Sequence, residues 1–310
     1  MAEESRTIYL MGTVIKLWVA HEDKVELLPE VEKRLIDYEK RFSANDETSE
    51  LMELKTQAGR VPVKLDEDLF ELIKLGKEHS LAKDSFLNIA MGPLIQAWHI
   101  GFSDAKRPSD YTIQALLKKT DPKNVYLNKA DKTVFLAKEG MSLDLGAIAK
   151  GYFADEILSY LKEKRATAAL IDLGGNVLTY GLSPKQSDGL WHIGIQDPFE
   201  KRGKLVAVLK VHDKSVVTSG IYERTNRFND KVYHHIFDQK TGFPVETELA
   251  SITVVSDKSV EGEIWTTRLF GKKPTEVIAA LNAVEGLSGI VITRKGEMLY
   301  SKSLEKQLVL

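Results

Sequence analysis

The sequence predicts an α+β fold, in which mainly antiparallel strands are covered by a few helices. From residue 125 onward, apolar stretches of strand length follow one another with turn signals between them, and few helical stretches interrupt the run. Strands joined by short turns pair antiparallel, whereas parallel strands need a helical crossover. Because no repeat or low-complexity linker divides the 310 residues, we predict one domain, 1–310, with a helical subregion at about 65–120.

The first half of the chain is predicted to contain one strand followed by helices. Residues 7–20 are rich in β-branched and aromatic side chains and indicate the strand. Residues 29–42 place apolar side chains at helical spacing behind Pro29, which suits a first helical turn. Further helices are expected over 66–83, 88–99 and 109–120. Gly92–Pro93 should begin or kink the second of these, and Ser109 should cap the third.

The second half is predicted to consist mainly of strands. Strand-rich stretches are expected at 125–137, 168–181, 190–197, 205–220, 233–246 and 249–257. Two helices break the run, one from about Ala147 to Lys164 and one from about Val260 to Leu269. Residues 284–301 indicate two last strands joined across a Lys-Gly turn.

Composition excludes several classes of function. The 43 basic and 45 acidic residues give a formal charge of −2, so no overall positive field attracts nucleic acid or an anionic membrane. No apolar stretch is long enough to span a bilayer, and "MAEESRTIYL" lacks the basic and apolar regions of a signal peptide. The absence of cysteine excludes disulfides, thiolate metal sites and thiol nucleophiles, so chemistry falls to other side chains and a hard metal ion.

Twice, an apolar stretch runs into an aspartate and then into glycine-bearing sequence. In "SLDLGAIAKG", Asp144 is expected where a strand gives way to a helix N-terminus, whose free N–H groups and dipole favour a phosphate. Lys150 in the first turn would add positive charge; in the alternative, Asp144 only caps the helix. In "LIDLGGN", two glycines allow the backbone to approach a ligand, or else form a hairpin turn to which Asp172 and Asn176 supply hydrogen bonds.

The stretch "SVVTSGIYERTNRF" follows a strand with small polar residues and two arginines. Ser219 and Gly220 could surround a phosphate or ribose, and Arg224 and Arg227 could pair with a phosphate or carboxylate. The alternative is a pair of solvated arginines at a strand end.

Two later stretches add an imidazole and a carboxylate. In "YHHIFDQKTG", His234 and His235 lie on opposite faces of a strand, so only one can point at a given site. Glu263 and Thr267 lie one helical turn apart on one face, where a carboxylate and a hydroxyl can both contact Mg²⁺, or where they simply belong to an ordinary helix surface.

The order of these motifs resembles the FAD:protein FMN transferase family, the ApbE-type flavin transferases. The likeness covers nearly the whole chain, through "MGT", "EKRFSANDETSEL", "NIAMGPL", "LDLGAIAKGY", "IDLGGN", "TSGIYER", "HHIFDQKTGFPV", "SITVVSD" and the Glu263/Thr267 helix. The resemblance implies an ApbE-type, T-fold-like arrangement of antiparallel sheets and helices. It also implies an enzyme that cleaves FAD with Mg²⁺, joins FMN through its phosphate to a Thr or Ser hydroxyl of an acceptor protein, and releases AMP.

The resemblance implies which residues form the site. Contacts to FAD are expected from Met11, Phe42, Phe86, Leu87, Asn88, Asp144, Lys150 and His235, to which the residue pattern adds Ser219 and Gly220. The expected metal ligands are the Ala147 carbonyl, Glu263 and Thr267, and the expected catalytic residues are His235 and Glu263. His235 is one candidate for the base that takes the acceptor's proton, and a metal-associated carboxylate is the other.

Two residues depart from the family's pattern. Glu263 stands where the family usually has an aspartate, so the helix or the metal must shift to keep octahedral geometry. Gln239 stands where proline is common, which is expected to affect only turn rigidity. Two other functions stay open: an FAD pyrophosphatase that releases FMN and AMP, and a non-catalytic flavin-binding protein, against which the Glu263/Thr267 pair argues.

Location is expected from the resemblance alone. Many relatives are exported lipoproteins, so we expect an extracytoplasmic protein held at a membrane by a lipid anchor that this chain lacks, although cytoplasmic relatives exist. "MAEES" lies a few residues before the first expected strand, where we expect an engineered start in place of a signal and lipid anchor.

Overall fold

An eight-stranded sheet forms the centre of the structure, a computed structural model that describes residues 2–22, 26–229 and 231–310. The strands lie in the order β1-β2-β6-β7-β10-β13-β14-β15, and neighbours pair antiparallel. They are β1 (Ala2–Leu10), β2 (Thr13–His21), β6 (Ala166–Asp172), β7 (Asn176–Tyr180), β10 (Ser215–Gly220), β13 (Leu249–Ser256), β14 (Ser288–Thr293) and β15 (Met298–Tyr300). The predicted α+β class is confirmed.

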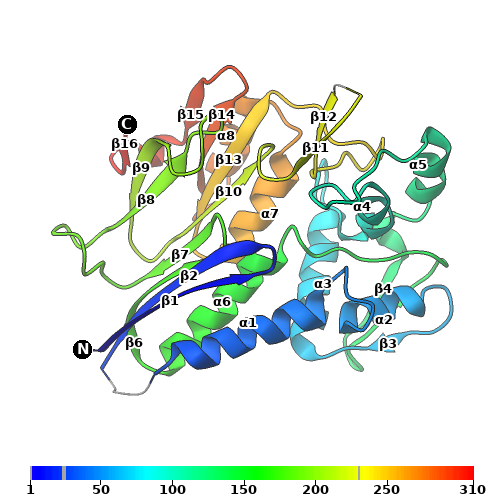
Figure 1. The fold of residues 1–310 in the computed structure, drawn as a ribbon, viewed down its shortest axis with the longest axis horizontal. Helices are drawn as coiled ribbons and strands as arrows, with labels where there is room; N and C mark the ends of the chain where they lie inside the picture. Colours follow the sequence, from blue (N-terminus) through cyan, green and yellow to red (C-terminus); the bar gives the residue numbers. More distant parts are fainter. Residues whose placement is uncertain (1, 23–25, 230) are drawn as a thin grey trace.

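Helices cover one face of this sheet, and a second sheet covers the other (Figure 1). The helices are α1 (Leu28–Phe42), α6 (Ala149–Glu163), α7 (Ser259–Leu269) and α8 (Pro274–Asn282), and the second sheet contains β16 (Leu308–Val309), β9 (Leu205–Val211) and β8 (Trp191–Gln196). Successive side chains of β2 alternate between the two cores, as the pleat of a strand requires. Leu17 packs in the core with α1 and α6, whereas Trp18 packs edge-on against Trp191, with ring centroids 5.5 Å apart.

A smaller region of helices and short strands adjoins α1 and α7. It contains α2 (Glu50–Thr56), β3 (Val63–Lys64), α3 (Glu67–Ser80), η1 (Ile89–Met91), α4 (Gly92–Trp98), α5 (Asp110–Leu117), η2 (Pro122–Asn124), β4 (Val125–Asn128) and β5 (Thr133–Leu136). The helices expected over 66–83, 88–99 and 109–120 are confirmed, and Ser109 Oγ caps α5 by accepting from the Thr112 N–H at 3.1 Å. The single-domain assignment stays a prediction. Across the described ranges, every helix falls short of the length and apolar character that a bilayer span requires.

The stretch 7–20 folds as part of a hairpin rather than as the single strand predicted. β1 and β2 pair with Leu10 opposite Thr13, across a two-residue turn at Met11 and Gly12. Both turn residues have positive φ, 54° and 70°, as hairpin turns that match the twist of the strands require. The turn is hard to predict because an apolar residue with positive φ is uncommon.

The structure also differs from the prediction in several short elements and in the segment before α6. The strand predicted just before α6 is absent, and residues 141–145 have no regular secondary structure. The strand expected over 233–246 is limited to β12 (Lys231–His234), which pairs with the unexpected β11 (Thr225–Phe228). α2 and α8 were also not predicted, because seven and nine residues give too little helical periodicity to stand out.

Candidate active site

The N-terminal ends of α6 and α7 lie close together and bring candidate residues to one corner. A Cβ added at Gly151 would lie 2.6 Å from the Ser259 carbonyl oxygen, so only glycine permits this approach. Lys150 lies in the first turn of α6, and Glu263 and Thr267 lie on successive turns of α7. The two helices therefore place a cation, a carboxylate and a hydroxyl in the same part of the molecule.

Asp144 lies just before α6 but does not cap it. The cap residue is Ile148, without a side-chain hydrogen bond, so the capping alternative is wrong. Asp144 Oδ1 instead accepts from the Gly146 N–H at 2.9 Å, while the Asp144 N–H donates to the Ile89 carbonyl at 2.9 Å. Burial raises the pKa of the Asp144 carboxyl, and the Gly146 N–H and the charge of Arg224 oppose the rise. Asp144 is thus a half-buried acceptor that its hydrogen bonds hold in place, close to Arg224.

Glu263 is a buried carboxylate close to Lys150. Only 6% of the residue is exposed, and burial raises the pKa of its carboxyl. The charge of Lys150 and a hydrogen bond from Asn176 oppose that rise. Asn176 Nδ2 donates to Glu263 Oε1 at 2.9 Å, whereas Oε2 has no hydrogen bond from the described residues. One carboxylate oxygen is therefore available to a metal ion or a substrate group.

The two histidines have different surroundings, although only His234 belongs to β12 and His235 lies just beyond its end. His234 is buried and its Nε2 lies 3.0 Å from the Val245 carbonyl oxygen. His235 Nδ1 lies 3.4 Å from the Arg224 carbonyl oxygen. Burial lowers the pKa of His235 to about 4, the charges of Arg224 and Lys150 lower it as well, and the contact with the Arg224 carbonyl opposes them. The imidazole is therefore neutral near pH 7, and a hydrogen on Nδ1 leaves Nε2 free to accept a proton.

Ala147, Glu263 and Thr267 offer the kinds of oxygen that Mg²⁺ prefers. At the start of α6, the Ala149 N–H donates to the Leu145 carbonyl and the Tyr152 N–H to the Ile148 carbonyl, so the Ala147 carbonyl has no backbone donor from the described residues. Thr267 is half-buried on α7. A carbonyl, a carboxylate and a hydroxyl are suitable ligands for a hard cation. Over the described ranges, no three His, Cys, Asp or Glu side chains form a metal-binding group. The expected ligand set would not form such a group, because Glu263 is its only side chain of these four types.

Ser219 and Gly220 end β10 beside α7. Ser219 Oγ donates to Thr266 Oγ1 at 3.0 Å, and Thr266 Oγ1 donates to the Glu263 carbonyl at 3.0 Å. The Ser219 hydroxyl therefore fastens β10 to the helix that carries Glu263. A contact of Ser219 and Gly220 with phosphate or ribose stays a prediction.

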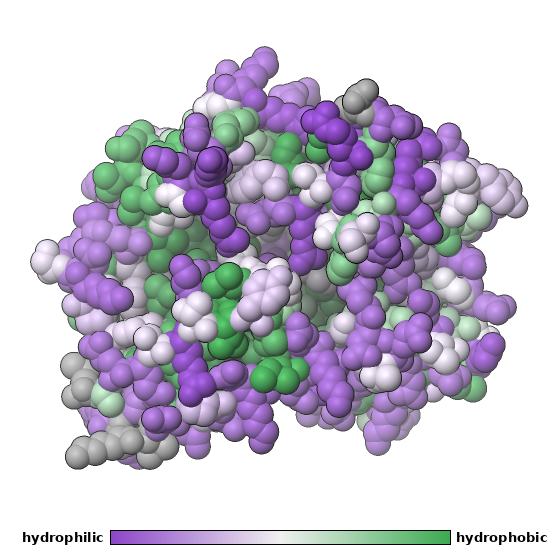
Figure 2. Space-filling view, in the orientation of Figure 1, coloured by the Kyte–Doolittle hydropathy of each residue, from purple (hydrophilic) through white to green (hydrophobic). Residues whose placement is uncertain are grey.

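Two residues expected to contact the flavin lie on the β1–β2 hairpin and on α1. The Met11 N–H, in the hairpin turn, donates to Glu39 Oε1 at 2.6 Å. Phe42, at the end of α1, packs edge-on against Phe153 of α6, with ring centroids 5.0 Å apart. Figure 2 shows the surface hollowed near the centre of this face, beside the tip of the hairpin, with hydrophobic residues gathered over the hairpin. The flavin-contact roles of Met11 and Phe42 stay predictions.

Residues 86–88, also expected at the flavin, are bound to the turn that follows the histidines. Asn88 Nδ2 donates to Gln239 Oε1 at 3.1 Å, and Gln239 Nε2 donates to the Ser85 carbonyl at 2.5 Å. Phe86 is half-buried and Leu87 is buried. Gln239 therefore joins two segments of the site, and the expectation that it affects only turn rigidity is wrong.

Asn176 is a residue of this corner that sequence reasoning missed. The β6–β7 hairpin is confirmed, with Asp172 Oδ1 accepting from the N–H groups of Gly174 and Gly175 at 3.0 and 3.2 Å. Asn176, expected to serve the same turn, points its side chain at Glu263 instead. A carboxamide at the start of a buried strand signals a need for hydrogen-bond partners. The partner lies 87 residues further along the chain, where no local pattern reveals it.

Comparison with known proteins gives one family. A sequence model of the ApbE family matches residues 11–291. The chain is 39% identical over 297 residues to an FAD:protein FMN transferase of Klebsiella pneumoniae (strain 342), covering 96% of this chain and 91% of that protein. It is 34% identical over 305 residues to the FAD:protein FMN transferase of Treponema pallidum (strain Nichols), covering 94% and 84%.

Solved structures share the fold. The ApbE protein of Thermotoga maritima aligns with a TM-score of 0.88 at 24% identity, over 99% of each chain. The flavin transferase ApbE of Vibrio cholerae aligns with a TM-score of 0.83 at 22% identity, again over 99% of each chain. The predicted ApbE-type fold is confirmed.

Proposed function

The chain belongs to the ApbE family, and we propose that it is a magnesium-dependent FAD:protein FMN transferase, which attaches FMN to a Thr or Ser hydroxyl of an acceptor protein and releases AMP. The observation that carries this proposal is the corner between α6 and α7. There, a buried carboxylate with one free oxygen, Glu263, lies close to Lys150. Such a corner suits an anionic substrate that arrives with a cation.

The proposed metal ligands are the Ala147 carbonyl, Glu263 and Thr267. Mg²⁺ bound there would neutralise negative charge that builds on the pyrophosphate as AMP leaves. Lys150 adds fixed positive charge, and the uncapped N-terminal turn of α6 adds free N–H groups and the positive end of the helix dipole. These groups would hold the pyrophosphate of FAD with its two phosphorus atoms in a defined orientation.

The transfer step needs an attacking oxygen, a leaving group and a proton acceptor. The acceptor hydroxyl oxygen attacks the phosphorus on the FMN side, the bond from that phosphorus to the bridging oxygen breaks, and AMP leaves with the electron pair. The hydroxyl proton goes to Nε2 of His235, which is neutral because burial lowers the pKa of the ring to about 4. A carboxylate at the metal is the second candidate for this base.

Intact-mass analysis tests the proposed activity. An acceptor domain with an exposed Thr, incubated with this protein, FAD and Mg²⁺, should gain the mass of one FMN less one water while AMP appears in equal amount, and EDTA should abolish both. AMP with free FMN and an unchanged acceptor mass would instead support an FAD pyrophosphatase. FAD that binds but stays intact would identify a non-catalytic flavin-binding protein and contradict the proposal.

Replacing His235 with asparagine tests its role as base. The asparagine amide can still donate to the Arg224 carbonyl but takes no proton, so single-turnover transfer at saturating FAD should slow about a hundredfold. FAD affinity should change little, since a neutral imidazole contributes no charge to phosphate binding. Because the pKa of His235 is about 4, wild-type kcat/KM should lose an additional factor as the pH drops toward that value, and the variant should show only the fall that protonation of Glu263 causes in both proteins.

His192→Asn, a change to a half-buried histidine of β8 that pairs with Asp188, provides the control and should leave both quantities unchanged. The opposite pattern, weaker FAD binding with an unaltered transfer rate, would make His235 a phosphate ligand and leave the carboxylate as base.

The acceptor protein and the location are proposed only from the family. The acceptor would carry an exposed Thr or Ser, and the protein would work outside the cytoplasm, held at the membrane by a lipid anchor.

A further inference from the structure

Asn176, at the start of β7, bonds two buried groups of α7 at once. Its Nδ2 donates to Glu263 Oε1 at 2.9 Å, and its Oδ1 accepts from Ser259 Oγ at 2.6 Å. Asn176 is 1% exposed and Ser259 is 0% exposed, so water does not replace either partner. A reversed amide would set its oxygen against the carboxylate and its NH₂ against the hydroxyl hydrogen. The two partners therefore fix which way the amide faces.

The hydroxyl that orients this amide is itself held in place. Asp155 of α6 accepts from the Ser259 N–H at 2.8 Å and from the Val260 N–H at 2.9 Å, through its two carboxylate oxygens. The close approach at Gly151 presses the same turn of α7 against α6. The first turn of α7 is bonded to α6. The hydrogen-bonded side chains of Asp155, Ser259, Asn176 and Glu263 therefore have little freedom to move.

We propose that Asn176, oriented by Ser259, is a positioning residue that turns the second carboxylate oxygen of Glu263 toward the metal. This inference rests on the proposed function, in which Glu263 is a metal ligand. A neutral amide satisfies one oxygen of the carboxylate without cancelling its charge, whereas a cation in the same place would compete with the metal. Glutamate has one more rotatable bond than aspartate and therefore more side-chain conformers. The hydrogen bond from Asn176 fixes Oε1 of Glu263 and so removes conformers in which Oε2 would point away from the metal.

Metal affinity measured without the acceptor tests this role. Mn²⁺, which accepts the same octahedral set of oxygen ligands as Mg²⁺, is titrated into the full chain with FAD present, and the signal of free Mn²⁺ is followed by electron paramagnetic resonance. Asn176→Ala should weaken Mn²⁺ binding about 10- to 100-fold, the usual effect of losing a partner of a metal ligand. Ser259→Ala should weaken it by a smaller factor, because the amide is then free to turn.

Glu263→Gln separates this inference from the proposed function. If Glu263→Gln loses Mn²⁺ binding while Asn176→Ala binds as tightly as wild type, the positioning role is overturned and the ligand role stands. If wild type and Glu263→Gln bind Mn²⁺ equally, the ligand assignment fails and the inference fails with it.

A double variant, Asn176→Ala with Glu263→Gln, tests whether Asn176 affects Mn²⁺ affinity by acting on Glu263. In the Glu263→Gln background, Asn176→Ala should cause no further loss of affinity, and an additive loss would mean general damage rather than positioning. Thermal unfolding in EDTA shows whether each variant folds. Should Asn176→Ala not fold, Ser259→Ala carries the test, and unaltered Mn²⁺ affinity in that variant overturns the inference.

Discussion

Replacing Glu263 with glutamine should slow FMN transfer about a thousandfold while leaving the protein folded. A metal ion contributes several kcal/mol of transition-state stabilisation, and glutamine replaces the carboxylate oxygen that would face Mg²⁺ with an NH₂ group, which is not a metal ligand. The glutamine keeps the shape of the side chain, and its Oε1 can still accept from Asn176. Single-turnover transfer, measured by intact mass at saturating FAD and Mg²⁺, gives the rate. Glu261→Gln, in the first turn of the same helix, is the control and should transfer at the wild-type rate.

Glu263→Gln should slow transfer, but without metal it should make the folded protein more stable relative to wild type. Burial raises the pKa of Glu263 above its ordinary value of 4.5, so the folded protein keeps a proton that the unfolded chain releases. Without metal, the free energy of unfolding of wild type should therefore decrease relative to Glu263→Gln as the pH rises above 4.5. Mg²⁺ with FAD should raise the melting temperature of wild type but hardly that of the variant. A variant that still transfers FMN and still gains stability from Mg²⁺ would exclude Glu263 as a ligand.

The parts of the fold that could be predicted are those that local patterns determine. α1 was predicted because Val31, Leu35, Tyr38 and Phe42 repeat at helical spacing and all lie in the core. The β1–β2 turn was missed, because Met11 adopts a positive φ that an apolar side chain seldom takes. In the structure, the Met11 N–H bonds Glu39 of α1, a contact that the turn residues themselves do not indicate.

The candidate site was predictable only as far as its residues form motifs along the chain. Asp144 and Lys150 belong to one contiguous motif, and the structure places Lys150 close to Glu263 of another. Asn176 and Gln239 escaped prediction, since their partners lie 87 and 151 residues away. Each was assigned to the turn beside it, because sequence periodicity reports on neighbours in the chain and not on contacts across the fold.

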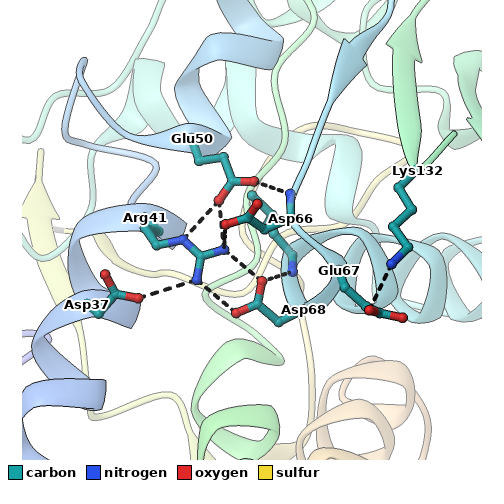
Figure 3. Close-up of polar contacts among 8 residues, drawn as sticks. Asp37, Arg41, Glu50, Asp66, Glu67, Asp68 and Lys132 are labelled. Carbon is teal, nitrogen blue, oxygen red and sulfur yellow. Dashed lines mark hydrogen bonds and ion pairs between the residues drawn. The ribbon is translucent and has the colours of Figure 1, made fainter.

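Arg41 forms the hub of an ionic cluster that joins three helices (Figure 3). It lies in the last turn of α1 and bonds Asp68 through two nitrogens at 2.9 and 2.7 Å. Two further nitrogen contacts reach Glu50 at 3.0 and 2.9 Å, and Asp66 and Asp37 lie at 3.1 and 3.3 Å. Glu50 begins α2, and Asp66 is the cap residue of α3. One guanidinium therefore holds the ends of α1, α2 and α3 together beside Phe42.

Replacing Arg41 with methionine should lower the free energy of unfolding by about 3–5 kcal/mol near neutral pH, since the change leaves two partly buried carboxylates, Glu50 and Asp68, without their cation. The Arg41 side chain is only 20% exposed, so water cannot fully replace it. Lys231→Met is the control; its pair with Glu246 is 60% and 89% exposed and should be worth about 1 kcal/mol or less. Urea unfolding measures both variants.

Salt should narrow the stability difference that the Arg41 change creates, and this separates charge from packing. Two surface cavities, of about 480 and 570 Å³, have Arg41 in their walls, so salt ions reach the cluster. Added salt screens the repulsion among the carboxylates in Arg41→Met, and it also screens their attraction to Arg41 in wild type. The two proteins should therefore come closer in stability as the salt concentration rises toward about 1 M. Adding Asp68→Asn to Arg41→Met should recover part of the loss at low salt. A difference that stays constant with salt and is not relieved by Asp68→Asn would mean that Arg41 acts through the packing of its aliphatic chain, because packing does not depend on charge.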